Sequence, residues 1–170
     1  MTIYARTPSP LGELLLVGEE SAEARDGVRL SSLSMPEQRG AVRVRPGWRR
    51  ADEAFAGAVR QLREYFEGRR KDFELDFGSS GTAFQEQVWS AVEAIPYSAT
   101  VSYGELSRQC GISSADVRAV GTAVGANPLL LVRPCHRVIG ADGAMRGYAA
   151  GIPRKEALLT LEGALQPRLV

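Results

Sequence analysis

Hydrophobic and polar positions alternate in the first part of the chain and then change period. The segments LGELLLVG (11–18) and VRLSSLSM (28–35) are typical of β-strands, and a charged loop lies between them. These strands predict an antiparallel sheet. Residues 51–68 follow a helical period instead, whereas DFELDF (72–77) alternates again and predicts a further strand. The apolar face of the helix comprises Phe55, Ala58, Val59, Leu62 and Phe66.

A polar segment, GSSG (78–81), then reads as a flexible linker. Beyond it Thr82 and Gln85 have the spacing of a capping box, which predicts the start of a helix. We therefore expect an α/β domain at 1–77 and a second, mostly α-helical domain at 82–170. The buried stripe of the new helix comprises Phe84, Val88, Trp89, Val92 and Ile95.

Two short helices follow, YGELSRQC from residue 103 and SADVRAVGTAVGAN at 114–127, with the turn GIS between them. This spacing predicts a helix-turn-helix, with Ser113 and Asp116 as a cap and valines on the inner face of the second helix. Its outer face carries small residues around one arginine. That composition suits close approach to a narrow DNA groove, with the arginine inserted, but it also fits a helix packed tightly in a core. The candidate DNA-binding residues are Arg118, Ala119, Thr122 and Gly125.

The composition and net charge of the chain limit the classes of function that it can have. With 170 residues, of which 44% are apolar, the chain can bury a core, and its net charge of +1 gives no general attraction for nucleic acid. Any DNA contact must therefore use a local surface. The absence of a leader pattern and of a disulfide framework predicts a reduced, cytoplasmic protein. No apolar run is long enough for a membrane span.

The only histidine, His136, directly follows one of the two cysteines. Cys110 ends an amphipathic helix, and we expect it to be a small buried hydrophobe. Cys135 differs because its proline, histidine and arginine neighbours can lower a thiol pKa. Neighbouring side chains point apart, so a bridging water is the natural proton relay between thiol and imidazole. Glu156, in the apolar helix segment RKEALL, is the candidate acceptor that orients the histidine.

A metal centre is not expected, because two cysteines and one histidine cannot supply the four ligands of a zinc site. Two interpretations of Arg133 stay open. In an extended segment it faces the same side as Cys135 and lowers the pKa of that thiol, or it simply points into solvent.

These residues carry a resemblance to a known family. The chain closely resembles the 6-O-alkylguanine-DNA alkyltransferases over about residues 80–163, and Pro-Cys-His-Arg in this context is highly specific. The resemblance is carried by GTAFQEQVW (81–89), IPYSATVSYGEL (95–106), RAVGTAVGANP (118–128), PCHRVIG (134–140) and GYAAGIPRKEALL (147–159). It implies a ribonuclease-H-like α/β N-terminal domain and a winged-helix-like C-terminal domain.

The resemblance also implies residue roles. Cys135 corresponds to the acceptor cysteine, His136 to the base acting through water, and Glu156 to the partner of the histidine. Asn127 corresponds to the hinge that ties the recognition helix to the active-site segment. Arg118 corresponds to the finger that fills the gap in the base stack. The pocket residues implied are Tyr103, which also crowds the 3′ phosphate, with Val138, Tyr148 and Ala149. Without the resemblance, the two tyrosines would read as half-buried core aromatics.

The implied activity is irreversible transfer of the alkyl group from 6-O-alkylguanine, and from 4-O-alkylthymine, in double-stranded DNA to a cysteine. Each molecule acts once, after flipping the base, without a cofactor, as a monomer whose binding to DNA could be cooperative. The chain departs from the family pattern at Ser98, which replaces a glycine, at Arg133, which replaces an apolar residue, and in VGAN, which lacks a basic residue. The alternatives are a non-catalytic binder of damaged DNA, a transcriptional regulator and a thiol hydrolase.

Overall fold

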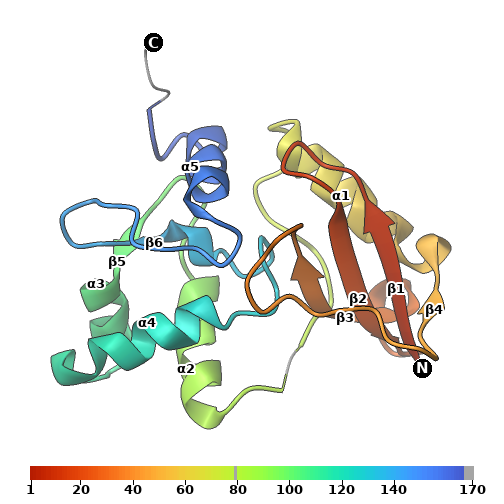
Figure 1. The fold of residues 1–170 in the computed structure, drawn as a ribbon, viewed down its shortest axis with the longest axis horizontal. Helices are drawn as coiled ribbons and strands as arrows, with labels where there is room; N and C mark the ends of the chain where they lie inside the picture. The colour runs from red at the N-terminus through yellow and green to blue at the C-terminus, as the bar shows by residue number, and fades with distance from the viewer. Residues whose placement is uncertain (79, 167–170) are drawn as a thin grey trace. The chain divides into compact units, whose positions relative to one another are not determined.

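The computed structural model describes residues 1–78 and 80–166 (Figure 1). The chain divides into two compact units, Met1–Ser80 and Gly81–Val170. Among the described residues, no helix combines the length and the apolar character needed to cross a bilayer.

A four-stranded sheet forms the base of the N-terminal unit, in the order β3-β2-β1-β4 (Figure 1). β2 runs antiparallel to both β1 and β3, as the alternating pattern predicts, and Leu14 pairs with Thr7. The short β4 runs parallel to β1, so the sheet is mixed rather than purely antiparallel. The strands are β1 (Thr2–Thr7), β2 (Leu14–Glu20), β3 (Val28–Ser34) and β4 (Arg49–Arg50).

One helical segment lies along this sheet (Figure 1). It begins as the 3-10 turn η2 (Asp52–Phe55) and continues as α1 (Ala56–Phe66); a further 3-10 turn, η1 (Arg25–Gly27), precedes β3. A 3-10 turn has about three residues per turn, whereas an α-helix has 3.6. The residues that α1 buries therefore differ in part from the apolar face predicted from a regular helical period. Val59 and Phe66 are only partly buried. The buried residues are Phe55, Ala58, Gln61, Leu62 and Tyr65.

The prediction of a strand at 72–77 is wrong. This segment makes a single parallel bridge, between Phe77 and Leu30 of β3. The buried Gln61 side chain forms hydrogen bonds with both main-chain groups of Glu74. It accepts from the N–H at 2.8 Å and donates to the carbonyl at 3.1 Å. Because a side chain satisfies this backbone, no regular ladder forms there.

Helices α2, α3 and α4 pack against one another in the C-terminal unit. Thr82 and Gln85 form the predicted capping box at the start of α2, with bonds of 3.1 and 3.0 Å. A second capping box joins Ser102 and Glu105 at the start of α3, whereas Ser113 caps the following 3-10 turn through the N–H of Ala115 instead of Asp116. The helices are α2 (Ala83–Glu93), α3 (Tyr103–Gln109), α4 (Val117–Gly125) and α5 (Ile152–Leu161).

Two short strands complete this unit, β5 (Val101–Ser102) and β6 (Val138–Ile139), which pair in parallel. Two 3-10 turns, η3 (Ser114–Asp116) and η4 (Cys135–Arg137), precede α4 and β6. Gly111 has φ of 71° and provides the left-handed residue that ends α3 before α4 begins. The predicted helix-turn-helix is therefore present as α3 and α4, with η3 between them.

Candidate active site and nucleic-acid interface

Tight turns present Cys135 at the start of η4. The N–H of Cys135 donates to the carbonyl of Arg133 at 2.7 Å, and Pro134 between them has φ of −77° and ψ of 62°, the geometry of an inverse γ-turn. Just upstream, Leu131 has φ of 72°, a region that branched side chains rarely adopt. A backbone held in this way places the thiol in one direction.

Asn127 links the end of the second helix-turn-helix element to this turn. Its side chain donates to the carbonyls of Leu129 at 3.2 Å and Arg133 at 3.1 Å, and it accepts from the N–H of Leu129 at 3.0 Å. The Asn127 side chain lowers the pKa of the Cys135 thiol, against a larger upward effect of burial. Asn127 and the N–H of Cys135 therefore both donate to the carbonyl of Arg133.

The partner of His136 is Glu162, and the prediction of Glu156 is wrong. His136 Nε2 lies 2.8 Å from Glu162 Oε2, and both side chains are fully buried. The two glutamates are six residues apart, about one and two-thirds helical turns, so they point in different directions. Glu156 lies instead beside a cavity lined by Gly143, Met145, Thr160, Leu165 and Gln166.

Arg137 completes this buried group. Its guanidinium donates to both Glu162 oxygens, at 2.8 and 3.0 Å, and to the carbonyl of Ile95 at 2.6 Å. Burial lowers the pKa of His136, although the bond to Glu162 opposes this effect. With a carboxylate beside Nε2, that nitrogen carries the proton and donates it. His136 Nδ1 has no hydrogen-bonding partner within the described residues, so it remains able to accept a proton.

Burial and the charge of Cys135 both act on the pKa values of the two predicted tyrosines. Burial raises the pKa of Tyr103, and the pKa of Tyr148 lies well above its ordinary value for the same reason; the charge of Cys135 adds to both effects. The Tyr103 ring also lies beside Gly121 of α4, where a β-carbon would be 3.8 Å away. The Tyr148 hydroxyl has no partner among residues 1–78 and 80–166. Val138 is fully buried in β6, and Ala149 is half-buried next to Tyr148.

Both interpretations of Arg133 are wrong: it neither faces the Cys135 thiol nor points into solvent. Its side chain is buried, its Nε donates to Glu93 at 2.9 Å, and its guanidinium lies 4.7 Å from the centre of the Trp89 ring. The cation that lowers the pKa of Cys135 is Lys155, a buried residue of α5 that the sequence reasoning missed. Lys155 shares a helical stripe with Leu158, Leu159 and Glu162, and that i, i+3, i+4, i+7 spacing is the signal that could have found both charged residues.

Helix α4 exposes the predicted DNA-binding face. Arg118, Ala119, Thr122 and Gly125 are all exposed, while Val120, Ala123 and Val124 are buried. Thr122 Oγ1 donates to the Arg118 carbonyl at 3.1 Å. Within the described chain Arg118 has no ion-pair partner, so its guanidinium is available to a ligand.

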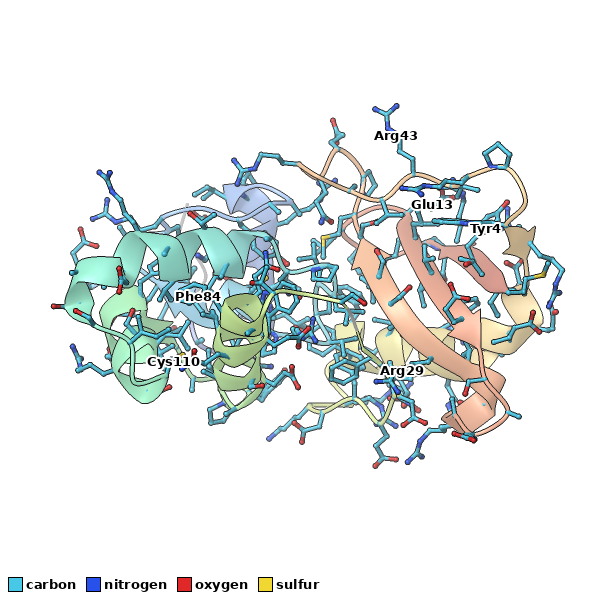
Figure 2. All side chains as sticks on the ribbon, turned by 90° about the horizontal axis from the view of Figure 1, so that it is seen from below. Tyr4, Glu13, Arg29, Arg43, Phe84 and Cys110 are labelled. Carbon is cyan, nitrogen blue, oxygen red and sulfur yellow. The ribbon has the colours of Figure 1, made fainter. Side chains whose placement is uncertain are left out.

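Cys110 differs from the prediction of a buried hydrophobe. It is partly exposed at the end of α3 (Figure 2), and its carbonyl accepts from Gln87 at 2.6 Å. Burial raises the pKa of its thiol, and no cation contributes. Burial raises the pKa of both thiols, but at Cys135 the Asn127 side chain and the Lys155 charge oppose this effect, whereas Cys110 has no such cation.

Comparison with known families accounts for this arrangement. The ribonuclease-like domain of 6-O-methylguanine DNA methyltransferase matches residues 2–78, and the DNA binding domain of the same family matches residues 83–164. The chain belongs to the 6-O-methylguanine DNA methyltransferase family. It is an enzyme of DNA repair that reverses alkylation damage directly.

Individual relatives of this family match over almost their whole length. Methylated-DNA--protein-cysteine methyltransferase of Mycolicibacterium paratuberculosis is 45% identical over 167 residues, which cover 98% of this chain and 96% of the relative. The protein of the same name from Methanosarcina acetivorans is 41% identical over 161 residues, which cover 95% of this chain and 98% of that relative. The crystal structure of Mycobacterium tuberculosis OGT in complex with DNA gives a TM-score of 0.84 at 44% identity, covering 94% of this chain and 92% of that one.

Proposed function

We propose that Cys135 accepts the alkyl group of 6-O-alkylguanine, and of 4-O-alkylthymine, in double-stranded DNA. The observation that carries this proposal is the polar group at the Cys135 turn: Asn127 and the N–H of Cys135 both bind the carbonyl of Arg133, and His136, next in the chain, is held by the buried Glu162. DNA is the macromolecular partner, consistent with the DNA complex of the mycobacterial relative.

In the proposed step the sulfur of Cys135 forms a bond to the alkyl carbon while the bond from that carbon to oxygen 6 breaks. The thiol loses its proton through a water to His136 Nδ1, which is free to accept it. Glu162 accepts the Nε2 proton of His136 in a hydrogen bond and so fixes the ring. The departing guanine takes up a proton and is restored. The thioether has no easy leaving group, so each molecule reacts once.

The base must leave the stack for this step, because oxygen 6 lies on the pairing edge inside the duplex. Arg118 on the exposed face of α4 fills the gap, and the small residues Ala119, Thr122 and Gly125 allow close approach to the groove. Tyr103 contacts the target base and its 3′ phosphate. Val138, Tyr148 and Ala149 form the pocket walls.

We also propose that the protein acts as a monomer, because the C-terminal unit alone holds every residue of the proposed site. Its boundary with the N-terminal domain lies in the linker at 78–81. A cytoplasmic location follows from the DNA substrate, since the curated relatives come from bacteria and archaea.

The test uses duplexes with one 6-O-methylguanine or one 4-O-methylthymine and compares Cys135→Ala with the matched variant Cys110→Ala. The parent and Cys110→Ala should restore the normal base, measured by chromatography of the digested DNA. Cys135→Ala should bind the duplex and restore nothing. Restoration by Cys135→Ala, or an equal loss in both variants, would contradict the assignment.

A further inference from the structure

The side chain and the main chain of Arg133 bind different parts of the C-terminal unit. The buried guanidinium contacts helix α2: its Nε donates to the Glu93 carboxylate at 2.9 Å, and its central carbon lies 4.7 Å from the centre of the Trp89 ring. The carbonyl of Arg133 belongs to the turn at 133–135, here called the acceptor turn, and accepts from the N–H of Cys135 at 2.7 Å. Arg133 therefore joins α2 to the acceptor turn.

Trp89 extends this connection to α4. Its indole N–H donates to the carbonyl of Ala123 at 2.9 Å, and both residues are buried. Ala123 lies on the inner side of the helix that exposes the DNA-binding face. Asn127, just beyond this helix, also binds the acceptor turn, because its side chain donates to the Arg133 carbonyl at 3.1 Å. Two sets of contacts thus run from α4 to the acceptor turn, one through Asn127 and one through Trp89 and the Arg133 side chain.

Arg133 stands where the family pattern has an apolar residue. An apolar side chain would fill the space beside Trp89 without loss of hydration, whereas burial of a guanidinium carries a desolvation penalty that an ion pair seldom outweighs. The arginine supplies directional contacts instead, a planar face on the indole ring and a hydrogen bond to Glu93, with the Glu86 carboxylate 4.0 Å away. Such contacts fix one conformation of the side chain and of the backbone that carries it.

We propose that Arg133 is a positioning residue for alkyl transfer: its side chain, fixed on α2, holds the acceptor turn in the orientation in which Cys135 reacts. This inference rests on the proposed transfer to Cys135. The guanidinium forms and breaks no covalent bond in that step, and Arg133 acts through its main chain. Because its side chain is buried and lies away from the exposed face of α4, loss of these contacts should slow the reaction without weakening DNA binding.

Single-turnover kinetics test this role in Arg133→Met. The matched control is Arg70→Met, which removes an arginine that pairs with Glu64 at 2.8 Å in the N-terminal unit. With excess duplex containing 6-O-methylguanine, Arg133→Met should give the parental burst at a rate constant roughly tenfold lower or more, because a misplacement of about 1 Å can cost about a hundredfold. The duplex concentration that gives half the maximal rate should stay within about twofold of the parental value, and Arg70→Met should match the parent throughout. A smaller burst at the parental rate constant would mean that the variant is only less stable, and would overturn the proposal.

A double variant separates the ion pair from a general effect on folding. Glu93→Gln keeps Arg133 but removes the charge with which it pairs, so it should slow transfer less than Arg133→Met does. Added to Arg133→Met, it should cause no further loss, because the contact is already broken. Losses that multiply in the double variant would contradict the proposal. Should Arg133→Met fail to fold, Glu93→Gln alone decides: slower transfer supports the role, and a parental rate constant refutes it.

Hydrogen exchange at the N–H of Cys135 tests the acceptor turn without any alkyl transfer. The chain has two cysteines, so nitrogen-15 labelling of cysteine gives one main-chain signal from this turn and one from Cys110, whose N–H donates to the Leu106 carbonyl at 3.0 Å. In Arg133→Met the Cys135 signal should exchange roughly tenfold faster, because exchange follows local opening of the hydrogen bond, while the Cys110 signal keeps its parental rate. An unchanged rate at Cys135 would overturn the proposal. If the parent transfers no alkyl group, the proposed function fails, while the exchange rates still decide whether Arg133 holds the turn.

Discussion

Replacing Glu162 by glutamine should destabilise the C-terminal unit far more than replacing Glu156. Glu162 is fully buried, and the side chain of its partner Arg137 is only 7% exposed. Removing the carboxylate charge leaves the guanidinium buried without compensation, which costs about 3 to 5 kcal/mol. The folded-to-unfolded ratio should therefore fall on the order of a hundredfold or more. Glu156→Gln is the matched control, and its cost should stay below about 1 kcal/mol because this side chain is partly exposed.

The assay is urea unfolding followed by the fluorescence of Trp89, in a Trp48→Phe background that leaves one tryptophan. The double variant Arg137→Met, Glu162→Gln should cost less than the sum of the single variants, because it removes both charges together. Glu162→Gln should also slow alkyl transfer by releasing His136. Equal destabilisation by Glu156→Gln and Glu162→Gln, or strictly additive costs in the double variant, would refute the assignment of this buried group.

Three further outcomes are expected. Arg118→Ala should slow repair of duplex DNA more than reaction with free 6-O-benzylguanine, because the free base needs no extrusion; equal losses on both substrates would argue against the finger role. The stability of the fold should fall as pH drops below about 6.5, where the histidine of the unfolded chain gains a proton while burial keeps the pKa of His136 lower. Replacing His136 by phenylalanine should flatten this dependence in urea unfolding, and an unchanged slope would count against it. Activity should survive exhaustive chelation, and recovery of lost activity by added zinc would contradict the absence of a metal requirement.

The sequence predicted the parts of the site that depend on local pattern. The neighbours of Cys135, the small exposed face around Arg118 and the Thr82 capping box depend on spacing along the chain, so they could be recognised without coordinates. Which glutamate contacts His136 depends on which face of α5 and of the residue that ends it is turned toward the core. An apolar helix segment made Glu156 a candidate, but the stripe that runs from Lys155 through Leu158 to Glu162 faces the core.

Arg133 illustrates a different limit. The prediction that it shares a side with Cys135 assumed an extended backbone. Pro134 instead forms an inverse γ-turn, so alternation does not hold, and the guanidinium stacks on Trp89. In the same way, the strand expected at 72–77 failed because the side chain of Gln61 takes over the backbone bonds of Glu74. Long-range partners of this kind cannot be inferred from periodicity.

The stoichiometry of repair tests the central claim most directly. The protein is mixed with excess duplex containing 6-O-methylguanine, and the guanine restored is followed together with the intact protein mass. If the thioether on Cys135 is the final product, about one equivalent of guanine should form in a burst and then stop. The protein should gain one methyl group, located by peptide mapping on Cys135 and not on Cys110. Continued turnover beyond one equivalent, or binding of the duplex without any gain in mass, would contradict the account.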